Sequence, residues 1–134
     1  MGDEDQIRRT LAEYSHACDD GRFDDLADLF APDARLSVLG NVASGRDAIR
    51  TSLAGAQPEG RRGVHITANT VVDVDGDSAT AETDYLFVRA TGVGAVEVVA
   101  AGRYRDTLVR HPDRWRFAVR AISILGVPDG GGGA

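Results

Sequence analysis

Histidine is the side chain in this sequence best suited to moving protons near neutral pH, because an imidazole changes its charge in that range. The chain holds three of them. His111 lies in a predicted turn and His16 lies off the apolar side of a predicted helix, so both are expected to face solvent. His65 is therefore the histidine with the strongest case for a role in chemistry.

His65 is the second residue of a predicted strand, where side chains alternate between two faces. One face is predicted to be apolar and holds Val64, Ile66, Ala68, Val72 and Val74. The other is semi-polar and holds His65, Thr67, Asn69 and Val71. A semi-polar face suits either solvent or the lining of a pocket. The alternative is a strand-edge or core histidine whose hydrogen bonds a neighbour satisfies.

Asp19 is a candidate partner because it ends the predicted first helix, where a carboxylate meets the negative end of the helix dipole and needs compensation. Tyr14 precedes it by five residues, so the two side chains are about 140° apart on an ideal helix. They could share a site only if the last turn is frayed or tightened. The alternative is that Asp19, Asp20 and Gly21 form an ordinary polar helix exit.

Arg120 is a third candidate, on the last predicted strand. It falls in an otherwise apolar row with Ala118, Ile122 and Ile124. Burying an unpaired guanidinium costs several kcal/mol, so Arg120 should meet an anion, either a protein carboxylate or a substrate. Arg116 is nearer the strand end and is expected to reach solvent.

Composition excludes several function classes. All 15 basic residues are arginine, so there is no lysine for a Schiff base, for pyridoxal phosphate or for a phosphate-binding loop. The net charge of -6 argues against binding to nucleic acid. The chain also lacks GxGxxG, HExxH, CxxC and GxSxG, which predicts no cofactor, no metal and no Ser-His-Asp hydrolase. His16 and Asp19 could share a metal only if His65 joined them.

Three features predict a cytoplasmic protein that does not enter a membrane. Cys18 is the single cysteine and cannot form an internal disulfide. The first residues are acidic, unlike a signal peptide, and no apolar stretch approaches the roughly 20 residues that span a bilayer.

The predicted elements give an α+β fold. Helices are expected over residues 5–19, 24–32 and 45–53, followed by a loop over 54–63. Strands are expected over residues 34–39, 64–74, 79–90, 95–109 and 115–125, joined mostly by short links that favour antiparallel pairing. Helices first and long strands second should place the helices on one face of a bent sheet. We expect one domain over residues 1–125 and a flexible glycine-rich tail over 126–134.

Four segments in this order resemble the SnoaL-like family of the nuclear transport factor 2-like superfamily. They are residues 14–34, Gly45-Arg46-Asp47-Ala48-Ile49, residues 65–79 from His65-Ile-Thr-Ala-Asn69 onward, and Gly102-Arg-Tyr104-Arg-Asp106 followed by Trp115-Arg-Phe. The resemblance covers about residues 5–125. It implies a cone-shaped curved antiparallel sheet wrapped around N-terminal helices, with a deep apolar pocket at the open end.

The resemblance also implies roles for the candidate residues. Scytalone dehydratase, bile acid 7α-dehydratase and hexachlorocyclohexane dehydrochlorinase use an Asp and His pair, which matches Asp19 and His65. An inward arginine of the dehydrochlorinase matches Arg120, and a tyrosine of the bile acid enzyme matches Tyr14. The second pocket histidine of scytalone dehydratase has no match here, because Asp84, Tyr85 or Phe87 lies in that region.

These observations predict a cofactor-free acid-base enzyme acting on a small apolar molecule in a biosynthetic or degradative pathway. A lyase of the dehydratase type or a cyclase is favoured over an isomerase, and the polyketide cyclases of the family fit the same machinery. A homodimer is expected through an apolar sheet face formed by Val96, Val98 and Ala100, or by Val99 and Ala101. The alternative is a non-catalytic domain of the same fold that binds a small ligand or dimerises.

Overall fold

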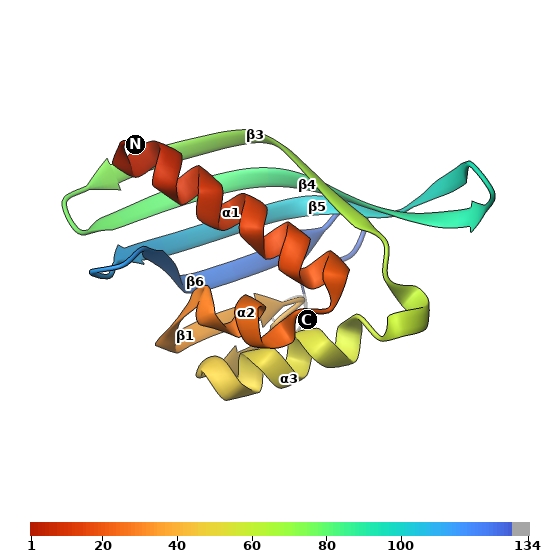
Figure 1. Ribbon diagram of the computed structural model, residues 1–134, viewed down its shortest axis with the longest axis horizontal. Coiled ribbons are helices and arrows are strands. Elements are labelled where there is room, and N and C mark those ends of the chain that lie inside the picture. Colours follow the sequence, from red (N-terminus) through yellow and green to blue (C-terminus); the bar gives the residue numbers. More distant parts are fainter. Residues whose placement is uncertain (130–134) are drawn as a thin grey trace.

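The computed structural model describes residues 1–129 (Figure 1). The helical elements are α1 (Asp3–Asp20), α2 (Phe23–Asp28), α3 (Arg46–Ala56) and a single 3-10 turn, η1 (Glu59–Arg61). The strands are β1 (Phe30–Val38), β2 (Asn41–Ser44), β3 (Val64–Asp75), β4 (Ser78–Gly92), β5 (Ala95–Arg110) and β6 (Trp115–Ile124). Of the tail predicted over residues 126–134, the part from 130 onward lies outside the described residues.

The strands form one curved sheet in the order β2-β1-β6-β5-β4-β3, with the helices gathered on one face (Figure 1). This confirms the α+β fold and the sheet wrapped around N-terminal helices. One pair departs from the antiparallel pattern, because β1 runs parallel to β6. The β4 and β5 hairpin projects beyond the rest of the sheet (Figure 1).

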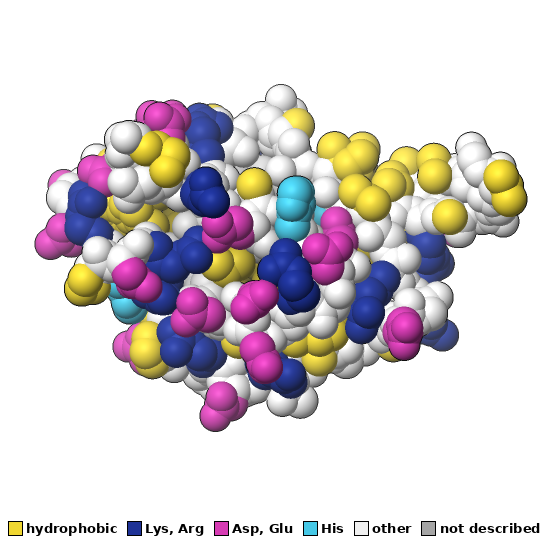
Figure 2. All heavy atoms as spheres, viewed as in Figure 1, with side chains coloured by type: hydrophobic (Ala, Val, Ile, Leu, Met, Phe, Trp, Pro, Cys, Tyr) yellow, Lys and Arg dark blue, Asp and Glu magenta, His cyan; other side chains and the backbone are white. Residues whose placement is uncertain are grey.

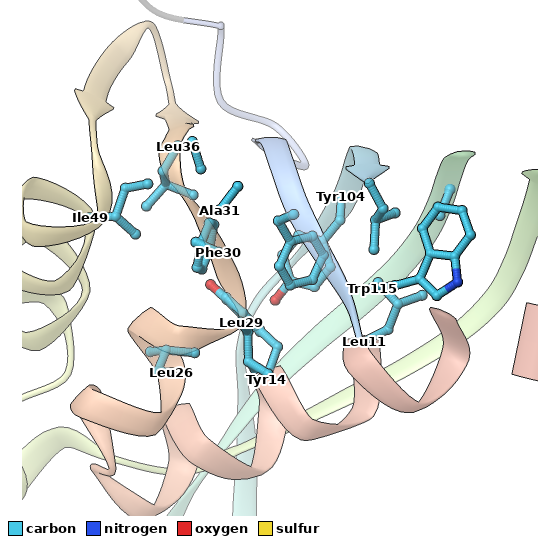
Figure 3. Packing of buried hydrophobic residues seen from close by; sticks show 14 of the residues in the cluster. Leu11, Tyr14, Leu26, Leu29, Phe30, Ala31, Leu36, Ile49, Tyr104 and Trp115 are labelled. Carbon is cyan, nitrogen blue, oxygen red and sulfur yellow. The ribbon is translucent and has the colours of Figure 1, made fainter. Parts of the chain in front are cut away.

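Helix α1 lies across the sheet because its apolar residues form one stripe. Ile7, Leu11, Tyr14 and Cys18 recur at spacings of four, three and four and are all buried. In Figure 3, Leu11 and Tyr14 point from α1 toward Tyr104 and Trp115 of the strands. The core thus lies between α1 and the sheet, which fixes where the end of α1 meets the first residues of β3.

The segment after α1 differs from the prediction. The second helix stops at Asp28 instead of continuing to Pro32, and β1 begins at Phe30 instead of residue 34. The backbone N–H of Phe117 donates to the carbonyl of Leu29, which draws this segment against β6. Pro32 is tolerated because it lies where the β1 and β6 register is interrupted and no N–H is required.

Two short elements were not predicted: strand β2, and the 3-10 turn η1, which lies within the predicted loop. The third helix, predicted to end near residue 53, continues to Ala56. Each concerns a short element or a helix end, where local pattern is weakest.

The faces of β3 also differ from the prediction. A bulge interrupts the register between Ala68 and Val71, and Asn69 adopts a positive φ of 57° there. The inward side consequently holds His65, Thr67, Thr70 and Val72, all partly buried. The outward side holds the exposed Val64, Ile66 and Val71. The predicted apolar row therefore does not form a buried face: its first half faces outward, and Val72 faces inward.

Strand β6 has a similar irregularity. Its register with β5 shifts between the pairs Thr107–Val119 and Leu108–Phe117. Phe117 and Arg120 are both buried as a result, whereas strict alternation placed them on opposite faces. Arg116, expected to reach solvent, is instead buried against the side chains of Asp28 and Asp113.

Candidate functional site

The side chains of Asp19 and His65 meet where the last turn of α1 passes the start of β3. The Nδ1 atom of His65 lies 2.5 Å from Oδ1 of Asp19. The same carboxylate accepts the backbone N–H of His65, at 3.0 Å from Oδ2 and 3.2 Å from Oδ1. These contacts supply the compensating partner that a carboxylate at the negative end of a helix dipole needs.

The surroundings of the His65 ring leave one nitrogen available. A carboxylate beside Nδ1 favours a proton on that nitrogen, which makes Nε2 the acceptor in the neutral ring. No hydrogen bond joins Nε2 to another residue in the range 1–129, and the side chain is 9% exposed. The ring of Phe87 packs against the imidazole with a centroid distance of 4.7 Å.

Arg120 binds a protein carboxylate, one of the two partners that the sequence allowed. Its Nε and Nη2 donate to the two oxygens of Asp106, at 2.8 and 2.9 Å. The side chains of Arg120 and Asp106 are 1% and 0% exposed. Burial alone would lower the pKa of Arg120, but the charge of Asp106 raises that pKa above its ordinary value. The Nη1 atom is buried without a hydrogen-bond partner among the described residues.

Three aromatic rings enclose the Arg120 guanidinium. Its Cζ atom lies 3.8 Å from the ring centroid of Tyr104, 4.1 Å from that of Tyr14 and 4.3 Å from that of Phe117. Tyr14 is therefore a neighbour of Arg120, and no hydrogen bond joins it to Asp19 within residues 1–129. Burial raises the pKa of Tyr14, so its hydroxyl stays protonated and can donate a hydrogen bond.

Sequence reasoning assigned no role to Asp106. A signal for it was present, since Asp106 lies between the hydrophobic Tyr104 and Leu108 in one alternating row of the strand. That is the same pattern that identified Arg120, and the two residues are opposite each other in the β5 and β6 register.

Cys18 lies near both pairs of residues. Burial raises the pKa of its thiol to about 12, and the negative charge of Asp19 acts in the same direction. The positive charges of Arg120 and Arg62 oppose this rise. The Cys18 thiol therefore stays neutral near pH 7.

The largest of the five cavities described for residues 1–129 lies elsewhere. It has a volume of about 750 Å³ and is lined by α1 residues between Gln6 and Glu13 and by the turn before β6, including His111 and Trp115. Glu13 is the lining residue nearest to Asp19 along α1, and it lies six residues before Asp19, about 9 Å at 1.5 Å per residue. None of the five cavities described for residues 1–129 is lined by Asp19 or His65, and the apolar pocket implied by the resemblance stays a prediction.

His16 and His111 do not join the site. His16 is exposed on α1, as expected, whereas His111 is partly buried in its turn. Within the described part of the chain, no group of three or more His, Cys, Asp or Glu side chains could hold a metal ion. None of the helices described combines the length and apolar character that crossing a bilayer requires.

Comparison with known proteins finds a matching family and a related protein of similar length. The model of the SnoaL-like domain matches residues 1–121. Uncharacterized protein Rv2910c of Mycobacterium tuberculosis is 32% identical over 123 residues, which cover 90% of this chain and 84% of the relative.

Two solved structures are similar in fold and sequence. A Novosphingobium aromaticivorans protein, provisionally assigned as a scytalone dehydratase, has a TM-score of 0.80 and 28% identity over 96% of this chain and 87% of its own. A Catenulispora acidiphila protein in complex with S-DNPA has a TM-score of 0.79 and 27% identity over 90% and 92%. The fold, the matched residues and these relatives together show that the chain belongs to the SnoaL-like family, within the nuclear transport factor 2-like superfamily.

Proposed function

We propose that this protein is a cofactor-free acid-base enzyme, a dehydratase or cyclase, that acts on a small apolar molecule beside the Asp19–His65 pair. The observation that carries the proposal is the 2.5 Å contact between Nδ1 of His65 and Oδ1 of Asp19. It orients the ring and leaves Nε2 as the proton acceptor.

In this proposal His65 removes a proton from the substrate, and Asp19 stabilises the imidazolium that forms. The electrons left on the substrate can then expel a hydroxide ion, which takes the proton back from the His65 imidazolium and leaves as water. Alternatively they attack a carbonyl carbon and close a ring, the carbonyl π bond breaks, and the alkoxide oxygen takes that proton. Both outcomes use the same two side chains, which is why dehydration and cyclisation are proposed together and ahead of isomerisation.

Tyr14 and Arg120 have different parts. The protonated hydroxyl of Tyr14 is the proposed donor to a developing oxyanion. Arg120 is neutralised by Asp106 and lies 4.1 Å from the centroid of the Tyr14 ring, so we assign it mainly to positioning that ring.

The family and its members support this class of reaction. One similar structure, from Novosphingobium aromaticivorans, carries a provisional assignment as a scytalone dehydratase, a lyase that eliminates water. The fold alone hosts enzymes and non-enzymes, so the argument depends on the Asp19–His65 geometry.

One observation favours the non-catalytic alternative. The Asp19 carboxylate also accepts the backbone N–H of His65 and thereby ties the end of α1 to the start of β3. A pair with only this structural task would serve a ligand-binding or dimerisation domain equally well.

A structure with a bound substrate analogue tests the proposal. We expect Nε2 of His65 at hydrogen-bonding distance from a substrate hydroxyl or from the carbon that loses a proton, with Asp19 behind the ring. A ligand bound without approaching His65, or turnover that survives His65→Gln, would overturn the proposal.

A further inference from the structure

Arg62 is a positively charged residue next to the Asp19–His65 pair. The reaction proposed above assigns it no role. It follows η1 and precedes His65 by three residues, a span of at most about 10 Å of extended chain. Its guanidinium packs against Gly21, two residues after Asp19. A Cβ built on Gly21 would lie only 2.3 to 2.6 Å from Cζ, Nη1 and Nη2 of Arg62.

Three contacts hold this guanidinium in place. Nε donates to the carbonyl of Gln57 at 3.2 Å, and Cζ lies 5.5 Å from the centroid of the Phe23 ring. The third contact is the close approach to Gly21, which also needs its positive φ of 70° to end α1. An arginine side chain that is already ordered loses little further freedom when it binds a ligand.

Among the residues that the structure describes, no carboxylate neutralises the charge of Arg62. It takes part in none of the ion pairs formed within residues 1–129. Arg120, the cation that the sequence analysis singled out, is bound to Asp106 through both carboxylate oxygens. Without Arg62, the negative charge of Asp19 would repel any anionic group that approached His65.

We propose that Arg62 is a substrate-binding residue at the edge of the Asp19–His65 site, and that it selects small apolar molecules carrying one anionic oxygen, such as a carboxylate or phenolate. The inference rests on the proposed function for its location and adds the substrate class. Nη1 and Nη2 are the donors, because Nε is engaged by Gln57. The charge of Arg62 also reaches the neighbouring Cys18 thiol, where it opposes the rise in pKa.

A pair of probes that differ only in charge tests this inference. Isothermal titration with 2-naphthoate and 2-naphthamide should show that the native protein binds the carboxylate about tenfold more tightly, the size expected for a charge-assisted hydrogen bond. Histidine ring resonances followed by NMR should shift for His65 and not for His16 when 2-naphthoate binds.

Two variants distinguish direct binding by Arg62 from an effect of the net charge of the protein. Arg62→Gln should lose the preference for 2-naphthoate, while Arg61→Gln, an exposed neighbour with the same change in net charge, should keep it. Thermal melting of each variant checks the fold. A preference that survives Arg62→Gln, an equal affinity of the native protein for both probes, or no binding of either at millimolar concentration would overturn the inference and leave Arg62 as a cation at the end of α1.

The binding result is independent of catalysis. His65→Gln should keep the preference for 2-naphthoate while losing turnover, so a failure of the acid-base proposal would appear in turnover alone. A failure of the Arg62 proposal would appear in the binding preference alone.

Discussion

Asp19 and His65 are joined at two levels, since one carboxylate binds both the imidazole Nδ1 and the backbone N–H of the same histidine. The ring is oriented by the first contact and the strand by the second. This double attachment means that a substitution can separate the chemical part of the pair from its structural part.

Asp19→Asn is the substitution that separates them. The asparagine Oδ1 can still accept the backbone N–H, so we expect the free energy of unfolding to change by less than about 1 kcal/mol. Turnover should fall by as much as about 10⁴-fold, because control of the tautomer and stabilisation of the imidazolium are lost. Urea unfolding and turnover of a substrate found by screening check the two parts.

The exposed neighbour Asp20 supplies the control for this substitution, and Asp20→Asn should leave both quantities unchanged within error. If Asp19→Asn and His65→Gln each cost about 2 kcal/mol or more of stability, the structural reading of the pair is favoured instead.

Cys18 should resist alkylation in the folded protein. Burial raises the pKa of its thiol to about 12, so the reactive thiolate is scarce at pH 8.5. In the unfolded chain a cysteine ionises near pH 8.5, so the contribution of Cys18 to stability is lost as the pH rises from about 8.5 toward 12. Mass spectrometry should find slow labelling by iodoacetamide in buffer and rapid labelling in urea. Equal rates in the two conditions would contradict the buried thiol.

Removing only one partner of the Arg120–Asp106 pair should lower the free energy of unfolding strongly. Asp106→Leu leaves a buried guanidinium without its anion, which typically costs about 3–5 kcal/mol. The double variant Asp106→Leu with Arg120→Met should be less destabilised than Asp106→Leu alone, because no buried charge remains. Urea unfolding measures both free energies. Glu82→Gln, which affects an exposed pair with Arg105, is the control and should cost less than about 1 kcal/mol.

We expect a homodimer through the outer face of the sheet. Val64, Val88 and Val98 form one row across three strands, and Ile66, Leu86 and Ala101 form the next. Figure 2 shows the opposite side of the molecule, which carries α1, and hydrophobic side chains are also visible there along the protruding hairpin. Ala100 does not belong to this face, because it is opposite the buried Phe87.

Light scattering at micromolar concentration tests the dimer, and Val98→Asp should convert it to a monomer by placing a charge in the interface. Val42→Asp provides the comparison, because Val42 is 59% exposed on β2 at the other edge of the sheet. A monomer mass for the native protein would count against the interface.

Long periodic segments were predictable and short ones were not. The stripe Ile7, Leu11, Tyr14 and Cys18 identified α1, and the alternation in residues 64–125 identified four strands. β2 was missed because four residues carry too little pattern. The start of β1 was missed because its pairing with β6 depends on residues almost 90 positions away in sequence.

The site was predictable in part for a related reason. Asp19 and His65 were each identified, and the resemblance indicated that they meet. The bulge at Asn69 could not be foreseen from alternation, because one extra residue exchanges the faces of everything after it. The hydrogen bond from the backbone N–H of His65 to Asp19 could not be predicted either, because every residue except proline has this N–H and the residue type therefore gives no indication of it.

The parallel pairing of β1 with β6 also bears on how the chain folds. The first strand of the protein completes its ladder only with the last, and Thr10 of α1 hydrogen-bonds to the carbonyl of Trp115, 105 residues later. Contacts this distant in sequence slow folding, because a long loop must close before they form. During synthesis α1 and β1 therefore wait for residues 115–124 to leave the ribosome, and until then the apolar stripe of α1 lacks part of its native cover.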